Sequence, residues 1–139
     1  MVIGYLIGVV AVGFILRYLI HEYYPVACVE IQESWFGLIE RGKKINIAIR
    51  GDANDCKSWD QRRVYFYMTW VNAKGRTSRG VYVKILRVKR YKNLYEYISD
   101  ELWEKVSPYL ASYDETVKEH KEFFDESRPI DCVEFEVKN

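Results

Sequence analysis

The sequence predicts an α+β fold in which an N-terminal single transmembrane helix precedes a mainly antiparallel β-sheet or partial barrel, two C-terminal helices and a final strand. Three observations lead to this prediction: an uncharged apolar run at the start, alternating apolar residues through the middle, and apolar residues four apart after Lys92. The chain has 139 residues, of which 49% are hydrophobic and 29% are charged. This composition excludes collagen-like, low-complexity and wholly disordered proteins.

The apolar run extends from Val2 to Leu16 without a charge and continues past Arg17 to Ile20. At 1.5 Å per residue, this segment reaches roughly 28 Å, close to the ~30 Å hydrocarbon layer of a bilayer. We therefore expect residues 1–25 to form a transmembrane anchor with a juxtamembrane segment, and residues 26–139 to form a soluble α+β domain. A buried core helix and a cleaved signal peptide are the alternatives, but no basic region precedes the run, as a signal peptide requires.

The positions of lysine and arginine predict the orientation of this anchor. Arg17, Arg41, Lys43 and Lys44 all follow the apolar run, and basic residues tend to stay on the cytoplasmic side. The expected localisation is therefore a membrane, as a signal-anchored single-pass protein with a cytoplasmic C-terminal domain. The three cysteines are odd in number and widely spaced, which predicts free thiols and neither a disulfide framework nor a metal site.

The expected anchor carries small residues on one helical face, at Gly4, Gly8 and Ala11. Small residues let two helices approach closely within lipid. This face predicts pairing of the helix with another membrane protein or with a second copy of the chain.

Alternation of apolar and polar residues predicts the strands. The clearest case runs from Val64 to Val71, turns at Asn72–Gly75, and returns over Gly80–Val88 as a hairpin. Short strands are also expected at Val26–Gln32 and Phe36–Glu40. The turn at Arg41–Lys44 suggests that the second of these pairs with Ile45–Ile49.

Two helices and a last strand are expected beyond Lys92. Leu94, Ile98, Leu102 and Val106 recur every four residues, which predicts an amphipathic helix over 93–106. A second helix follows, for which Ser112 and Glu115 offer a capping box. Val133, Phe135 and Val137 then alternate as a strand that could return to the sheet.

Charge is divided along the chain, which is basic up to Lys92 and acidic after it. Folding could bring the two halves together or present them to different partners. Basic residues are concentrated on the expected hairpin, interleaved with tyrosines, at Arg62, Arg63, Lys74, Arg76, Arg79, Lys84, Arg87, Lys89 and Arg90. Cations beside aromatic rings suit nucleic acid, a nucleotide or anionic lipid headgroups.

Sequence motifs predict no catalytic residue, metal ligand or cofactor, because the phosphate-binding GxxxxGK[ST], the dinucleotide-binding GxGxxG, GxSxG and HExxH are all missing. His21 and His120 are expected at the membrane boundary and on a helix surface. The leading prediction is a membrane-anchored accessory or regulatory protein that acts through protein–protein contacts. The alternatives are a membrane-tethered module whose basic hairpin recognises nucleotide, nucleic acid or anionic lipid, and an unrecognised membrane-bound hydrolase or transferase. The expected partners are the bilayer, another membrane protein and an anionic ligand, with nucleic acid less favoured.

Overall fold

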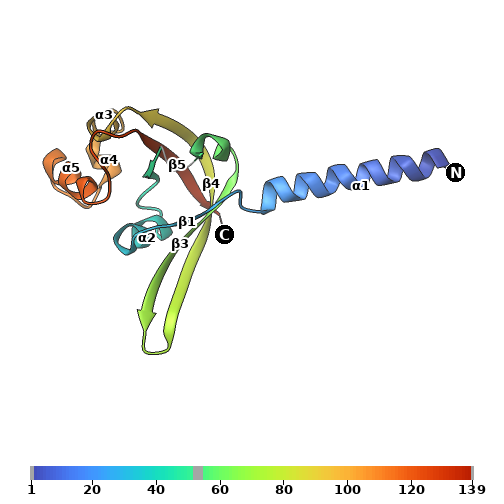
Figure 1. Cartoon of the computed structure of the whole chain (residues 1–139), viewed down its shortest axis with the longest axis horizontal. Coiled ribbons are helices and arrows are strands. Elements are labelled where there is room, and N and C mark those ends of the chain that lie inside the picture. The colour runs from blue at the N-terminus through green and yellow to red at the C-terminus, as the bar shows by residue number, and fades with distance from the viewer. Residues whose placement is uncertain (1, 52–54, 139) are drawn as a thin grey trace.

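A five-stranded sheet curls into a half-barrel in the computed structural model, which describes residues 2–51 and 55–138 and gives the backbone alone for 2–7 and 21–23 (Figure 1). The strands are β1 (Cys28–Glu30), β2 (Asn46–Arg50), β3 (Arg63–Asn72), β4 (Gly75–Tyr91) and β5 (Ile130–Lys138). Their order across the sheet is β1-β3-β4-β5-β2. The helices are α1 (Val2–Tyr23), α2 (Glu33–Glu40), the 3-10 helix η1 (Cys56–Trp59), α3 (Leu94–Asp100), α4 (Trp103–Val106) and α5 (Tyr113–Lys121).

Strands β3 and β4 form the hairpin that alternation predicts, with ten antiparallel pairs from Arg63–Lys84 to Asn72–Gly75. Gly75 has a φ of +116°, a conformation that glycine adopts without the strain of a side chain. The end of this hairpin projects from the body of the molecule (Figure 1). Both faces of the hairpin are therefore exposed near its turn, whereas one face is buried nearer the body of the molecule.

The final strand returns to the sheet and lies inside it, antiparallel to both β4 and β2. This pairing makes the predicted hairpin between Phe36–Glu40 and Ile45–Ile49 wrong. Residues 33–40 are helical because Trp35, Phe36 and Ile39 lie on one buried helical face, and five residues of alternation do not distinguish a strand from a helix. β1 pairs with β3 in parallel, so the sheet is mixed.

The predicted helix over 93–106 is interrupted. Asn93 caps α3 by accepting a hydrogen bond from the backbone N–H of Glu96 at 2.9 Å. Leu102 has a φ of +66°, which ends this helix before α4 begins. Half of the expected capping box of α5 is present, because Ser112 Oγ accepts from the N–H of Glu115 at 3.2 Å. Glu115 Oε2 accepts from the N–H of Ala111, one residue before the cap, at 3.0 Å.

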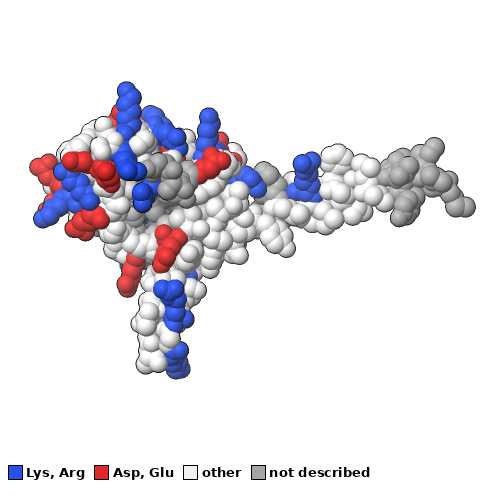
Figure 2. All heavy atoms as spheres, viewed as in Figure 1, with Lys and Arg blue, Asp and Glu red and all other residues white. Residues whose placement is uncertain are grey.

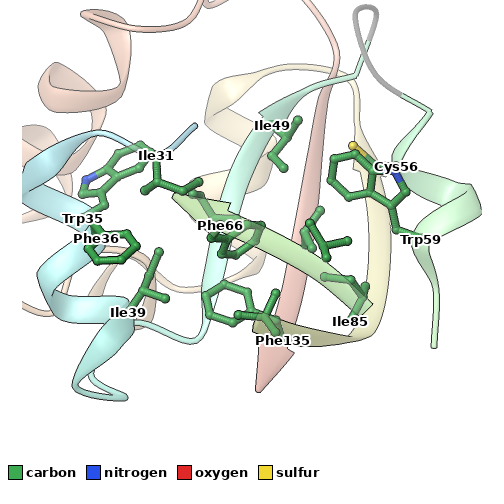
Figure 3. Packing of buried hydrophobic residues seen from close by; sticks show 14 residues of the cluster. Ile31, Trp35, Phe36, Ile39, Ile49, Cys56, Trp59, Phe66, Ile85 and Phe135 are labelled. Atoms are coloured by element: carbon green, nitrogen blue, oxygen red, sulfur yellow. The ribbon is translucent and has the colours of Figure 1, made fainter. Parts of the chain in front are cut away.

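Two buried clusters lie on opposite faces of the sheet. The first packs α2 and η1 against β2, β3, β4 and β5, and includes Phe66 and Phe135, whose rings meet edge to face (Figure 3). The second packs α3, α4 and α5 against the other face, around Tyr91, Tyr97 and Ile98. On this second face of the sheet, α3, α4 and α5 leave β1, β3 and the N-terminal half of β4 uncovered.

The prediction of a membrane-spanning anchor over Val2–Ile20 is wrong. Across the part of the chain that the structure describes, no helix combines the length and the hydrophobicity that crossing a bilayer requires. On the predicted packing face, Gly8 has open space around it, and Gly4 lies outside the residues whose surroundings are described. Pairing of this face with another helix stays a prediction.

Candidate functional site

Three tyrosines lie side by side on the uncovered part of the sheet. Val64 and Phe66 point into the first buried cluster, so Tyr65 and Tyr67, which alternate with them, point away from it. Tyr82 on β4 is directly opposite Tyr65. We call this surface, with the basic residues around it described below, the tyrosine face.

The rings of the tyrosine face contact one another. The centroids of Tyr65 and Tyr67 are 6.2 Å apart with an angle of 17° between the rings, and those of Tyr65 and Tyr82 are 4.9 Å apart. Gly80 makes room for this arrangement, because a Cβ at that position would lie 2.2 Å from the Tyr65 ring. The tyrosine rings are therefore held against the sheet and still keep part of their surface exposed to solvent.

Basic side chains surround these rings. The Arg63 guanidinium lies 5.6 Å from the Tyr82 ring centroid, and Lys84 is the cross-strand neighbour of Arg63. Arg76 borders a shallow hollow of about 500 Å³, the tyrosine hollow, lined by Cys28, Tyr65, Tyr67, Thr69, Arg76, Thr77 and Ser78. Figure 2 shows basic side chains along one side of the projecting hairpin, away from the mixed charges over the helices.

The structure divides the predicted basic hairpin into two groups. Arg87, Lys89 and Arg90 form ion pairs with Glu101 and Glu134, with Asp100, and with Asp131, respectively. Arg79 forms an ion pair with Glu40 on α2. These four side chains are therefore engaged within the molecule, although the Arg79–Glu40 and Lys89–Asp100 pairs are largely exposed. Arg63, Arg76 and Lys84 belong to the tyrosine face, while Lys74 lies exposed beside the turn and Arg62 precedes β3.

A buried polar cluster that the sequence did not reveal lies between α2, β2 and α5. Lys44 Nζ is fully buried, donates to the carbonyl oxygen of Val106 at 2.6 Å, and lies 4.8 Å from the Trp35 ring centroid. Burial lowers the pKa of Lys44 to about 8, although Glu119 opposes that shift. Trp35 Nε1 donates to Tyr109 Oη at 2.7 Å and to Glu119 Oε1 at 3.0 Å.

His120 belongs to the same cluster and is buried, so its predicted place on a helix surface is wrong. Its Nδ1 contacts the carbonyl oxygen of Thr116 at 2.9 Å, and its ring centroid lies 5.1 Å from that of Trp35. Burial lowers the pKa of His120 to about 4. Lys44 follows a predicted turn, so no periodic pattern marked it as buried. His120 shares a helical stripe with Val117 and Phe124, and this spacing, rather than the charged residues beside it, indicates its place in the core.

A cleft separates β1 from β2, the two edge strands of the half-barrel. This edge cleft has a volume of about 480 Å³, and Trp35 separates it from Lys44. Its lining combines aromatic and aliphatic side chains with a few polar ones: Val29, Glu30, Ile31, Gln32, Glu33, Trp35, Ile47, Ala48, Ile49, Arg50, Thr69, Phe123 and Phe124. Such a mixture is typical of small-molecule sites. Over the described residues, no three metal-ligating side chains lie together.

Comparisons with known proteins identify the fold. No family model and no curated protein matches the sequence. The chain is similar to the crystal structure of the hypothetical protein PH0355, with a TM-score of 0.59 and 21% identity over 81% of this chain and 98% of that one. For the solution structure of PF0455 from Pyrococcus furiosus, the TM-score is 0.52, with 19% identity over 80% and 94%. For an ASCH domain from Lactobacillus crispatus, it is 0.54, with 16% identity over 83% and 80%.

These similarities show the fold alone, an α+β half-barrel sheet with helices. This chain covers 98% of PH0355 and 94% of PF0455, and the described residues hold no membrane-spanning helix. The predicted membrane-anchored accessory protein, its membrane localisation and its single-pass orientation are therefore wrong. A functional interpretation has to start from the surface of the half-barrel domain.

Proposed function

We propose that this protein binds single-stranded nucleic acid through the tyrosine face. The observation that carries the proposal is the row of Tyr65, Tyr67 and Tyr82, held in mutual contact on the part of the sheet that α3, α4 and α5 leave uncovered. Each base offers a flat face that can stack on such a ring, and one stacked base contributes roughly 1–3 kcal/mol.

The cations of the tyrosine face complete this surface. Arg63, Arg76 and Lys84 lie around the rings, where their charges can contact the phosphates that flank stacked bases. A duplex keeps its bases stacked on one another, so a row of exposed rings favours a single strand. A protein partner would contact the same tyrosines but would not require a chain of phosphates.

The first test is fluorescence anisotropy of the full-length protein with labelled single-stranded RNA and DNA of about 12 nucleotides at low salt. We expect binding that weakens as salt rises, with a slope of about −2 in a plot of log K against log salt, because about three phosphates are contacted. The matched duplex should bind more weakly. Failure to bind either single strand at about 50 mM salt would refute the proposal.

Tyr82→Ala tests the stacking contribution. We expect about a tenfold loss of affinity for the single strand, because one base loses its stacking partner. The matched control is Tyr95→Ala on α3, since Tyr95 is 39% exposed and Tyr82 is 42% exposed, but Tyr95 lies away from the tyrosine face. Equal losses in the two variants would show that the tyrosine face is not the binding surface.

A further inference from the structure

The half-barrel is open between β1 and β2, the two edge strands that border the edge cleft. An edge strand pairs with a neighbour on one side only, so half of its backbone N–H and C=O groups face away from the sheet. The hydrogen bonds that β1 and β2 make with their neighbours show which of these groups face the cleft.

On β2, the backbone groups of Ala48 face the cleft. Just before this strand, the Phe135 N–H donates to the carbonyl oxygen of Ile45 at 2.9 Å, and just after it, the Gly51 N–H donates to that of Pro129 at 3.3 Å. In an antiparallel ladder, bonded residues alternate with residues whose N–H and C=O point the other way. Ala48 is such a residue and is only 4% exposed. Its N–H and C=O have no hydrogen-bond partner among the described residues.

On β1, the backbone groups of Glu30 face the cleft from the opposite side. The Tyr65 N–H donates to the carbonyl oxygen of Ala27 at 3.0 Å. The Ile31 N–H donates to the carbonyl oxygen of Tyr67 at 2.7 Å. Alternate residues of a parallel strand bond to the same neighbour, so residues 27, 29 and 31 bond to β3. The N–H and C=O of Glu30, which lines the cleft, are left unpaired within the described chain.

Between these two edges, the cleft offers apolar rings and one unpaired polar side chain. Phe123 is 50% exposed in the lining of the cleft, and its ring centroid lies 5.8 Å from that of the buried Trp35. Gln32 Nε2 also belongs to the lining; it is buried and has no hydrogen-bond partner within the described residues. A buried donor of this kind favours a ligand that brings an acceptor.

We infer that the edge cleft binds an extended peptide segment, which lies between β1 and β2 as an additional strand and closes the half-barrel. The backbone of the segment pairs with Ala48 on one side and with Glu30 on the other, and one of its carbonyl oxygens accepts from Gln32 Nε2. An apolar side chain of the segment contacts Phe123 and Trp35. A strand carries donors and acceptors on both of its edges, which matches the two sides of the cleft.

Strand addition to an exposed sheet edge is a recurrent mode of peptide recognition, in which main-chain hydrogen bonds provide affinity and side-chain pockets provide specificity. In this chain, Ala48 and Glu30 supply the main-chain groups, and Phe123 with Trp35 forms the side-chain pocket. Peptide binding goes beyond the proposed function and does not depend on it, because none of the three tyrosines of the tyrosine face lines the edge cleft.

The first test screens the full-length protein against an array of blocked seven-residue peptides that vary at their three central positions. We expect the best peptide to carry an apolar central residue and to bind in solution with a Kd below about 1 mM. Methylation of a central backbone nitrogen should weaken binding by about tenfold, because it removes a main-chain hydrogen bond. Failure of every peptide to bind, or equal binding after methylation at each central nitrogen, would overturn the inference.

Phe123→Ala tests the side-chain pocket and should also weaken the best peptide by about tenfold, because apolar contact area is lost. The matched control is Ile45→Ala, since Ile45 is 48% exposed and lies next to β2 but does not line the cleft. Equal losses in the two variants would show that the peptide binds elsewhere. Tyr82→Ala should weaken the oligonucleotide and leave the peptide unaffected, so this inference and the proposed function can fail separately.

Hydrogen exchange measured by NMR tests the main-chain pairing directly. Saturation with the best peptide should slow exchange of the Ala48 and Glu30 amides by roughly tenfold or more, and should leave the Ile49 amide, which already faces β5, unchanged. A bound peptide that leaves the Ala48 and Glu30 amides unprotected would overturn the inference. Self-association of the chain that protects these amides without peptide would place a second copy in the cleft and would overturn it as well.

Discussion

His120 shows at the residue scale how burial links this fold to pH. The imidazole is enclosed by Trp35, Tyr97 and Phe124, and burial opposes its positive charge. Lys44 is nearby and acts in the same direction. The spacing of Val117, His120 and Phe124 places the three residues on one helical face, which is a partial sign of this environment. Trp35 and Tyr97, which complete the enclosure, come from distant segments of the chain, so local periodicity does not reveal them.

We expect the stability of the protein to fall between pH 6.5 and pH 4 on account of His120. The unfolded histidine has a pKa of about 6.5 and the folded one has a pKa of about 4, so between these values the unfolded chain binds more protons. The contribution of His120 to the free energy of unfolding is fully present above pH 6.5. It decreases by about 3 kcal/mol as the pH falls towards 4. Urea unfolding at several pH values would measure it.

His120→Gln is the control for this prediction, because glutamine does not titrate. Protonation of carboxylates with lowered pKa values, such as Asp100 and Glu101, also lowers the stability of the protein in acid, and it does so in the native chain and in the variant alike. The variant should therefore lose about 3 kcal/mol less than the native chain over this pH range. An identical pH dependence in the two proteins would contradict the assignment.

At the scale of elements, ion pairs show that folding brings the basic and acidic halves of the chain together. The basic strand β4 meets the acidic residues of α3 and β5, and Arg87 is the most connected example. It donates to Glu134 Oε2 from Nε at 3.0 Å and also binds the Glu101 carboxylate, while Tyr91 Oη donates to Glu101 as well. Burial would raise the pKa of Glu101, but the hydrogen bonds from Arg87 and Tyr91 lower it overall. Part of the basic hairpin is therefore neutralised within the molecule.

Arg87→Met should destabilise the protein by about 2 kcal/mol, because the side chain of Glu101, only 9% exposed, would lose its cation. Arg79→Met removes a pair with Glu40 whose side chains are 55% and 36% exposed, and it should cost less than about 1 kcal/mol. Thermal unfolding of the two variants gives the comparison. A smaller effect at Arg87 than at Arg79 would show that the buried pair does not tie α3 to the sheet.

Predictions of single elements from the sequence succeeded for β3 and for the start of α5, and failed at Phe36–Glu40 and at Leu102. The ten residues of β3 alternate clearly, and the capping residues of α5 mark its start. Phe36–Glu40 is too short to separate strand from helix, and the break at Leu102 depends on a backbone conformation that spacing cannot reveal. The sequence predicts the tyrosine face in part, as tyrosines among basic residues. It does not reveal that Arg87, Lys89 and Arg90 form ion pairs within the fold, because these pairs depend on the order of the strands.

At the scale of the whole molecule, β4 joins the two buried clusters. Val83 and Ile85 lie in the first cluster and Tyr91 lies in the second, on one continuous strand. The sequence could not predict that β5 enters the sheet between β4 and β2, because that pairing depends on residues from distant parts of the chain. The prediction of a membrane-spanning anchor also fails at this scale, because none of the described helices meets the requirements for crossing a bilayer.

Ile98→Ala tests whether the two clusters unfold together. This substitution removes a fully buried side chain from the second cluster and should cost about 3 kcal/mol. If the shared strand couples the clusters, hydrogen exchange of the β3 amides next to the first cluster should accelerate by the same free energy. Unchanged β3 protection with faster exchange in α3 would instead show two independent units.

The placement of the edge cleft between β1 and β2 has a consequence for the order of folding. The β3–β4 hairpin pairs neighbours in sequence and closes through a tight turn, whereas β2 pairs with β5 across most of the chain. Closing so long a loop costs entropy before the pairing stabilises it, so contacts of this kind form slowly. The tyrosine face can therefore assemble early, with the hairpin. The edge cleft depends on the pairing of β2 with β5, which joins the most distant strands of the sheet in sequence, so we expect the cleft to form late in folding.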